Sequence, residues 1–243
     1  MNVTLPERTV EAWIAAYLGR TFQNVVLWSP TQRGPTDYDL AVGLPSPGKL
    51  FVLESKAPQM DPPAVGHGFR LDPRQLYNYL RHPQLRNRTY YVLPCPPFAA
   101  APLPAVPVGG LPITPLVPPP ALTRIGSEKW MRIVAASDLW PLLGLKAAVP
   151  AKGKPWWPPK AAPPLGAPPA KPFISLDCTT WPKNLPYRPL ADFVSDLRQC
   201  KETGLVVHPR DPDLSVIQDA DQSLGEIGQV VYVPQRDLPG FKP

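Results

Sequence analysis

The sequence predicts an α/β fold of the α+β kind, and three observations lead to this prediction. The first 95 residues show helical and strand-like patterns in the order helix, three strands, helix, strand. Prolines number 39 in 243 residues, about three times the ordinary frequency, and they concentrate after that first region. Short helix and strand patterns then return near the end. We therefore predict a core over 1–95, proline-rich connecting and wrapping segments over 96–172, and a small α+β extension over 173–243, packed on the core or on a partner.

The first expected element is a helix. Thr4 is a good N-cap, and Glu7, three residues later, completes a capping box, so Glu7 is assigned a structural role. An apolar stripe with helical spacing follows, and Gly19 ends the helix. The stripe consists of Val10, Trp13, Ile14, Tyr17 and Leu18. Glu11 is interpreted first as part of a solvated helix face. A strand is then expected over 24–28.

Residues 36–42 and 50–56 are expected to form a hairpin, since both alternate apolar and other residues as half-buried strands do. Between them, Pro45, Pro47 and Gly48 favour a turn. With residues 45–48 as the loop, Leu44 lies opposite Lys49. Counting outward from this pair along the two strands gives the other residues that lie opposite each other.

In that register Asp39 lies opposite Glu54 and Asp37 lies opposite Lys56, all on one face of the sheet. Carboxylates this close repel each other unless a cation or a proton relieves the repulsion. Mg²⁺ prefers oxygen ligands and commonly takes one or two carboxylates, which leaves positions for water and phosphate. Lys56 would then activate the attacking water or stabilise charge on a phosphate. The simpler interpretation is a surface salt-bridge cluster on a hairpin.

A second helix is expected from Asp72-Pro73, a good N-cap and first-turn pair, to about Arg81. Gln75 and Tyr79 are four residues apart and share one face of this helix. Tyr79 alone would be interpreted as an aromatic residue at the edge of the core. A strand over 89–93 follows and stops at Pro94.

Five arginines cluster around this second helix, opposed only by Asp72. Such a group can bind successive phosphates, although a solvated basic face is the alternative. They are Arg70, Arg74, Arg81, Arg86 and Arg88.

Asp39 followed after a turn by Glu54-Ser55-Lys56 resembles the D…(D/E)xK signature of the PD-(D/E)XK, or restriction-endonuclease-like, nucleases. Residues 75–79 (Gln-Leu-Tyr-Asn-Tyr) resemble the QhxxY motif of the RecB-type branch. The motifs come in the family's order, and the expected elements match its minimal core of helix, three-stranded meander, helix and strand. The resemblance covers roughly residues 5–95.

The resemblance implies a Mg²⁺ ion, for which Mn²⁺ can substitute, bound by Asp39 and Glu54, with the Ser55 carbonyl as a further ligand. It implies that Lys56 serves the attacking water or the phosphate. Gln75 and Tyr79 would support Lys56 or contact the nucleic acid. Some members of the family place a carboxylate of the first helix against the metal, which makes Glu11 a candidate supporting group together with Asp37.

Charge and cysteine content fit this expectation. Residues 1–160 contain 17 Lys/Arg and 9 Asp/Glu, a net of +8, whereas residues 161–243 contain 8 and 10, a net of −2. The basic part coincides with the expected catalytic part, as a surface that binds a polyanion requires. Three distant cysteines suggest neither a disulfide framework nor a C-x-x-C metal site. With no signal segment and no apolar run of about 20 residues, a cytoplasmic location is expected.

Beyond residue 95 the sequence carries less functional signal. The tryptophans Trp156 and Trp157 are expected to pack on the core or meet a protein partner. Further strands are expected over 130–134, 173–176, 204–207 and 229–233, with a helix over 188–200.

The sequence thus predicts a Mg²⁺-dependent nuclease, acting on DNA rather than RNA on family frequency, with a role in restriction, repair or antiviral defence. Two alternatives stay open. One is a nuclease-fold subunit that binds nucleic acid or a larger assembly without cutting it. The other is an interaction protein built around the proline-rich half.

Overall fold

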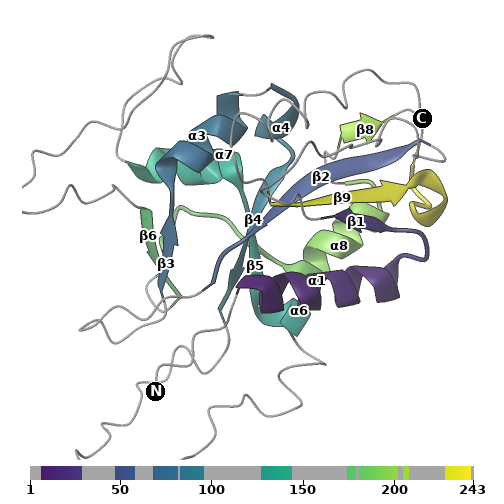
Figure 1. The fold of residues 1–243 in the computed structure, drawn as a ribbon, viewed down its shortest axis with the longest axis horizontal. Coiled ribbons are helices and arrows are strands. Elements are labelled where there is room, and N and C mark those ends of the chain that lie inside the picture. Colours follow the sequence, from purple (N-terminus) through teal and green to yellow (C-terminus); the bar gives the residue numbers. More distant parts are fainter. Residues whose placement is uncertain are drawn as a thin grey trace, which may run out of the picture.

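The computed structural model describes residues 7–28, 47–57, 68–81, 83–95, 127–143, 174–178, 181–201, 205–207 and 228–241. These residues form a mixed α+β fold with a central sheet covered by helices on both faces (Figure 1). The predicted hairpin strand over 36–42, the N-cap Thr4 and most of the proline-rich segments lie outside the described residues.

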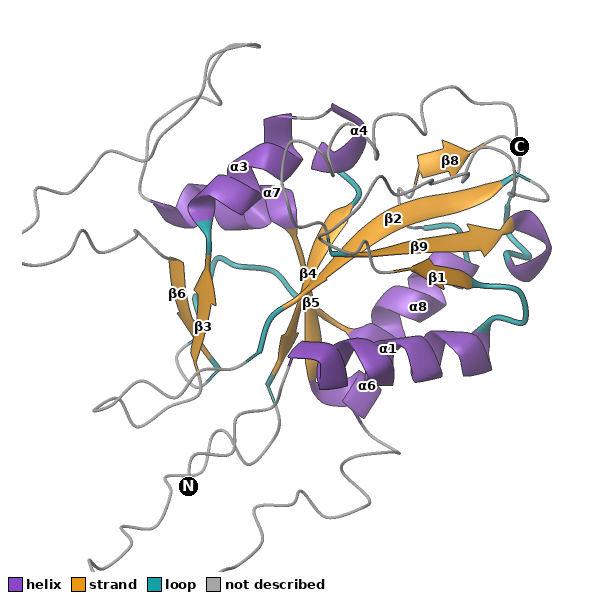
Figure 2. Ribbon diagram, viewed as in Figure 1, coloured by secondary structure: helices purple, strands orange, loops and turns teal. Residues whose placement is uncertain are grey.

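The central sheet is mixed, and its described strands follow the order β1-β9-β2-β4-β5-β7, with β8 beside β2 (Figure 2). The pair of β2 and β4 is parallel, whereas the other neighbours are antiparallel. The strands are β1 (Val26–Trp28), β2 (Gly48–Ser55), β4 (Thr89–Pro94), β5 (Met131–Ala135), β7 (Arg188–Pro189), β8 (Leu205–Val207) and β9 (Gln229–Pro234). A separate two-stranded sheet pairs β3 (Gly68–Leu71) with β6 (Ile174–Asp177).

Helices lie on both faces of the central sheet. On one face are α3 (Pro73–Arg81), α4 (Pro83–Arg86) and α7 (Ala136–Leu139), and on the other are α1 (Glu7–Thr21), α6 (Ser127–Trp130) and α8 (Leu190–Arg198). Two 3-10 turns, η2 (Trp140–Leu143) and η4 (Gln235–Asp237), complete the described elements. The arrangement is a three-layer sandwich.

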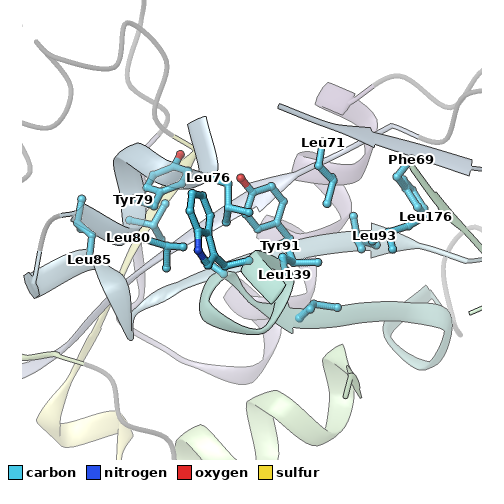
Figure 3. Close-up of a cluster of buried hydrophobic side chains, with 14 of the residues drawn as sticks. Phe69, Leu71, Leu76, Tyr79, Leu80, Leu85, Tyr91, Leu93, Leu139 and Leu176 are labelled. Atoms are coloured by element: carbon cyan, nitrogen blue, oxygen red, sulfur yellow. The ribbon is translucent and has the colours of Figure 1, made fainter. Parts of the chain in front are cut away.

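The apolar residues of β2 explain why both faces are covered. Leu50 and Val52 belong to the hydrophobic cluster under α3 and α7; Figure 3 shows other members of this cluster, among them Leu76 and Leu139. Phe51 and Leu53 belong to the cluster under α1 and α8. Because side chains alternate across a strand, a continuous apolar run needs cover on both sides, and every residue of β2 is buried.

The expected helices and strands are present where the structure describes them. Asp72 accepts the first intrahelical hydrogen bond of α3, from the Leu76 amide at 3.1 Å, as an N-cap residue does. The first helix extends two residues past Gly19 to Thr21, whose hydroxyl donates back to the Tyr17 carbonyl.

The predicted register of the hairpin is wrong at Lys49. Lys49 pairs with Val206 of β8 on one side and with Val233 of β9 on the other. The predicted hairpin puts Leu44 opposite Lys49 instead. The prediction treated β2 as one strand of a half-buried pair, but its run of apolar residues is that of a central strand.

The predicted meander puts residues 36–42 between the strand over 24–28 and the strand over 50–56. In the structure β9 lies between these two strands, β1 and β2. Val231, for example, pairs with Leu27 of β1 on one side and with Phe51 of β2 on the other. A strand from the expected extension over 173–243 is therefore part of the same sheet as the expected core over 1–95.

Among the described helices, none combines the length and the apolar character that crossing a membrane requires.

Candidate active site

The strongest cluster of functional groups lies at the carboxyl end of β2. Glu54 is the last residue but one of this strand and pairs with Tyr91 of β4. The strand ladder continues one step further, because the Lys56 amide donates to the Val92 carbonyl at 3.1 Å. The backbone of both charged residues is thus fixed by β4.

Both carboxylate oxygens of Glu54 have partners. Oε1 accepts a hydrogen bond from Lys56 Nζ at 2.5 Å, and Oε2 accepts one from the Tyr79 hydroxyl at 2.7 Å. Lys56 Nζ also lies 3.7 Å from Glu7 Oε1 at the start of α1. Glu54 and Lys56 thus connect the end of β2 to α3 through Tyr79 and to α1 through Glu7.

Exposure rises in steps across this network. The side chain of Glu54 is 5% exposed, that of Lys56 is 18% exposed, and that of Glu7 is 44% exposed. A buried carboxylate is costly unless it is paired and hydrogen-bonded, and Lys56 and Tyr79 supply both conditions. The series leads from the core to solvent.

The electrostatics of the site keep Tyr79 protonated. Burial raises the pKa of Tyr79 well above its ordinary value, and the nearby Glu54 charge raises it further. Tyr79 therefore acts as a hydrogen-bond donor to Glu54 throughout the ordinary pH range.

Two carboxyl groups of α1 have raised pKa values at the site. Burial raises the pKa of Glu7; the Lys56 charge lowers it, whereas those of Glu54 and Glu11 raise it. The pKa of Glu11 is raised by burial and by the Glu54 charge. For both groups burial is the largest cause of the raised pKa, and the Lys56 charge does not offset it.

Among the described residues, several buried polar atoms lack a hydrogen-bond partner. They include the Tyr91 hydroxyl, opposite Glu54 on β4 and on the same face of the sheet, and the Ser55 hydroxyl and Gln229 Oε1, whose positions belong to the other face. In Figure 3 the hydroxyl groups of Tyr79 and Tyr91 point to the same side of the cluster. Such atoms are rare in folded proteins and each calls for an explanation.

The structure brings together three of the residues predicted for the site: Glu54, Lys56 and Tyr79. Glu11 lies one helical turn from Glu7 and is coupled electrostatically to Glu54. Asp37 and Asp39 lie outside the described residues. The metal ligand predicted at Ser55 is its backbone carbonyl, and its side chain is buried. Gln75 is half-buried on α3, one turn before Tyr79.

The five predicted phosphate-binding arginines are distributed over several elements. Arg70 lies on β3, Arg74 and Arg81 lie on α3, and Arg86 ends α4 with an exposed side chain. The Arg88 carbonyl accepts a hydrogen bond from the Val52 amide. Arg88 thus directly precedes β4 and lies three residues before Tyr91, the partner of Glu54, or roughly 10 Å along the strand at about 3.3 Å per residue.

Sequence reasoning missed two residues of the site. Glu7 was assigned a capping role only, although Glu7 and Glu11 are like charges four residues apart, which destabilises an isolated helix and could have marked both as functional. Gly228, whose amide donates to the Tyr79 hydroxyl at 3.0 Å, carried no local signal.

The donor types at the site fit a hard divalent cation. Glu54, Glu7 and Glu11 offer carboxylate oxygens, and the raised pKa values of Glu7 and Glu11 reflect, besides burial, a repulsion that a cation would relieve. Within the described ranges, no group of three or more His, Cys, Asp or Glu residues is placed to hold a metal ion. A complete ligand set would therefore need groups outside those ranges, such as Asp39.

Comparison of the chain with protein-family models, with curated proteins and with solved structures finds no match.

Proposed function

We propose that this protein is a metal-dependent nuclease that hydrolyses phosphodiester bonds, with DNA rather than RNA as substrate. One observation carries the proposal: a buried carboxylate, Glu54, is held by a lysine and a tyrosine at the carboxyl end of a central strand. Three residues from two separate sequence motifs, Glu54-Ser55-Lys56 and Gln75…Tyr79, thus form one hydrogen-bonded unit.

In this proposal Asp39 and Glu54 would hold Mg²⁺ or Mn²⁺, which would polarise the phosphate and lower the pKa of a bound water. Lys56 donates hydrogen bonds to the attacking water or to a phosphate oxygen, where negative charge develops. Tyr79 fixes the orientation of Glu54 through Oε2. Gln75 and the arginines around α3 contact the nucleic acid.

The biological setting follows from the proposed chemistry. A nuclease of this type would act in restriction, repair or antiviral defence, in a reducing cytoplasm. All three cysteines, Cys95, Cys178 and Cys200, are free thiols, as such a compartment favours.

The test is a cleavage assay on single- and double-stranded DNA and RNA with Mg²⁺, Mn²⁺ or EDTA. Wild-type protein is expected to cut only with metal. Lys56→Ala should reduce the rate at least about a hundredfold, since removing one such donor has that order of effect in other enzymes. Asp39→Ala should abolish cleavage, and Lys201→Ala, at an exposed lysine beyond α8, should cut as the wild type does. Equal cleavage by Lys56→Ala and wild type would refute the proposal.

One observation favours a second candidate, a nuclease-fold subunit that binds nucleic acid or a protein assembly without cutting. Both oxygens of Glu54 already have partners inside the protein, as in a purely structural network. Such a protein would bind nucleic acid equally with Mg²⁺ or with EDTA and would cleave in neither.

A further inference from the structure

We propose that Gly228 is a positioning residue for Glu54, and that β9, from the far end of the chain, thereby completes the site. The inference deepens the proposed function and rests on it. It depends on two independent contacts of Gly228, one through its amide and one through its missing side chain.

The first contact is a relay of hydrogen bonds. The Gly228 amide donates to the Tyr79 hydroxyl at 3.0 Å, and the same hydroxyl donates to Glu54 Oε2 at 2.7 Å. Because a hydroxyl has one proton, the amide fixes its direction: the lone pair faces Gly228 and the proton faces Glu54. Tyr79 thus cannot turn its proton away from the carboxylate without losing a hydrogen bond.

The second contact is steric. A methyl group at position 228 would lie 2.5 Å from the Leu53 carbonyl oxygen and 2.7 Å from Glu54 Oε2. Both distances are far shorter than carbon–oxygen contacts allow. Any side chain at Gly228 would therefore push β9 away from β2 or turn the carboxylate of Glu54 out of its place.

Position in the sheet explains why a residue so distant in sequence reaches the site. Gly228 immediately precedes Gln229, which pairs with Leu53 of β2, so it lies beside Glu54 at the edge of the ladder. Tyr79 and Gly228 are 149 residues apart, and no local pattern links them.

The chain offers a matched control at the other end of the same strand pair. A methyl group at Gly48 would lie 2.5 Å from the Val233 carbonyl oxygen and 2.5 Å from the ring of Tyr232. Gly48→Ala therefore crowds β2 against β9 as severely as Gly228→Ala does, but away from Glu54.

The first test does not depend on catalysis. Amide hydrogen exchange of the full chain is followed by NMR in the wild type and in Tyr79→Phe. Exchange at Gly228 should accelerate at least about fivefold more than exchange at Val230 and Val231 in the β9 ladder, because Gly228 loses a hydrogen bond of its own whereas the ladder amides follow only the change in global stability. Unchanged exchange at Gly228, or equal acceleration along all of β9, would overturn the relay.

The second test compares cleavage by the two alanine variants. Gly228→Ala should reduce the rate at least about tenfold, whereas Gly48→Ala, with comparable loss of stability, should stay within about twofold of the wild type. Equal losses in both would overturn the positioning role and leave a structural glycine. If the wild type cuts nothing, the proposed function fails, and the exchange experiment still decides whether Gly228 and Tyr79 are linked.

Discussion

A buried carboxylate imposes different demands on the two tyrosines beside it. The rings of Tyr79 and Tyr91 are in edge-to-face contact at 6.4 Å, and both are fully buried. The hydroxyl of Tyr79 donates to Glu54, whereas that of Tyr91 has no hydrogen-bond partner in the part of the chain that the structure describes. The same substitution should therefore have opposite effects at the two positions.

Tyr79→Phe should lower the free energy of unfolding by about 1–3 kcal/mol, because Glu54 Oε2 and the Gly228 amide each lose a partner. Tyr91→Phe should leave it unchanged or raise it by up to about 1 kcal/mol, because it removes an unpaired buried hydroxyl. Urea unfolding of both variants and the wild type measures the difference. A larger loss in Tyr91→Phe than in Tyr79→Phe would contradict the assigned hydrogen bonds.

The raised pKa of Glu7 gives a pH dependence with a definite sign. A carboxyl group whose pKa is higher in the folded state favours folding when protonated, so its contribution to stability falls as the pH rises from about 4.5 through the folded pKa. In Glu7→Gln the side chain cannot ionise, so the variant does not lose stability in this way. The free energy of unfolding of Glu7→Gln minus that of the wild type should therefore increase from pH 4 to pH 7. The increase should be less than about 1 kcal/mol because Glu7 is partly exposed.

Unfolding curves at several pH values measure this difference, and Glu128→Gln, remote on α6, serves as a control. A difference between Glu7→Gln and wild type that shrinks as the pH rises would show that pairing with Lys56 outweighs burial and repulsion.

At the scale of single residues, the sequence predicts which residues lie together when they are close in the chain. Glu54 and Lys56 are two residues apart on a strand, and Tyr79 shares a helix face with Gln75, as spacing alone predicts. That this helix face meets Glu54 was implied only by the resemblance to the PD-(D/E)XK nucleases. Glu7 was assigned to a cap because the capping box is also local. Gly228 could not be predicted, since its role depends on a contact that only the folded sheet creates.

At the scale of elements, α8 shows how the C-terminal region stabilises the strands that carry the site. Phe193 of α8 is 1% exposed and packs edge to face against Phe51 of β2 at 5.6 Å and Tyr90 of β4 at 4.8 Å. One helix side chain thus bridges the two parallel strands of the central sheet.

Phe193→Ala should lower the free energy of unfolding by about 3–5 kcal/mol, the range for truncating a buried phenylalanine. Gln199→Ala, at an exposed position just after α8, should change it by less than about 0.5 kcal/mol. Chemical unfolding compares the two variants. A loss below about 1 kcal/mol for Phe193→Ala would mean that α8 does not cover β2 and β4 as described.

Periodicity predicted the helices and strands well, because the apolar pattern of an element depends only on the residues within it. It did not predict which strands lie next to β2. Two strands joined by a proline- and glycine-rich turn suggest a hairpin, yet Lys49 pairs with strands that come more than 150 residues later. The clue was the unbroken run from Leu50 to Leu53, which indicates a strand covered on both faces.

At the scale of the whole molecule, the first and the last described strands, β1 and β9, are neighbours in one sheet. The Asn24 amide and side chain both donate to the Asp237 carboxylate, at 2.7 and 3.1 Å. This links the loop before β1 to the turn after β9. Because β9 lies between β1 and β2, a chain of residues 1–95 has both β1 and β2 but lacks the strand that pairs with each of them.

A chain of residues 1–95 should therefore not fold, although the sequence motifs alone would make it the complete core. Without β9, β1 has no described partner, and Val52 and Phe51 lose one neighbouring strand. Without α8, Phe51 and Leu53 lose cover on the face they share with α1. Exposed edges and apolar surface of this kind favour aggregation.

Thermal unfolding followed by circular dichroism should show a cooperative transition for the full chain and none for residues 1–95. A cooperative transition in the fragment would show that β9 is an addition to the core and would remove the structural basis for the role of Gly228.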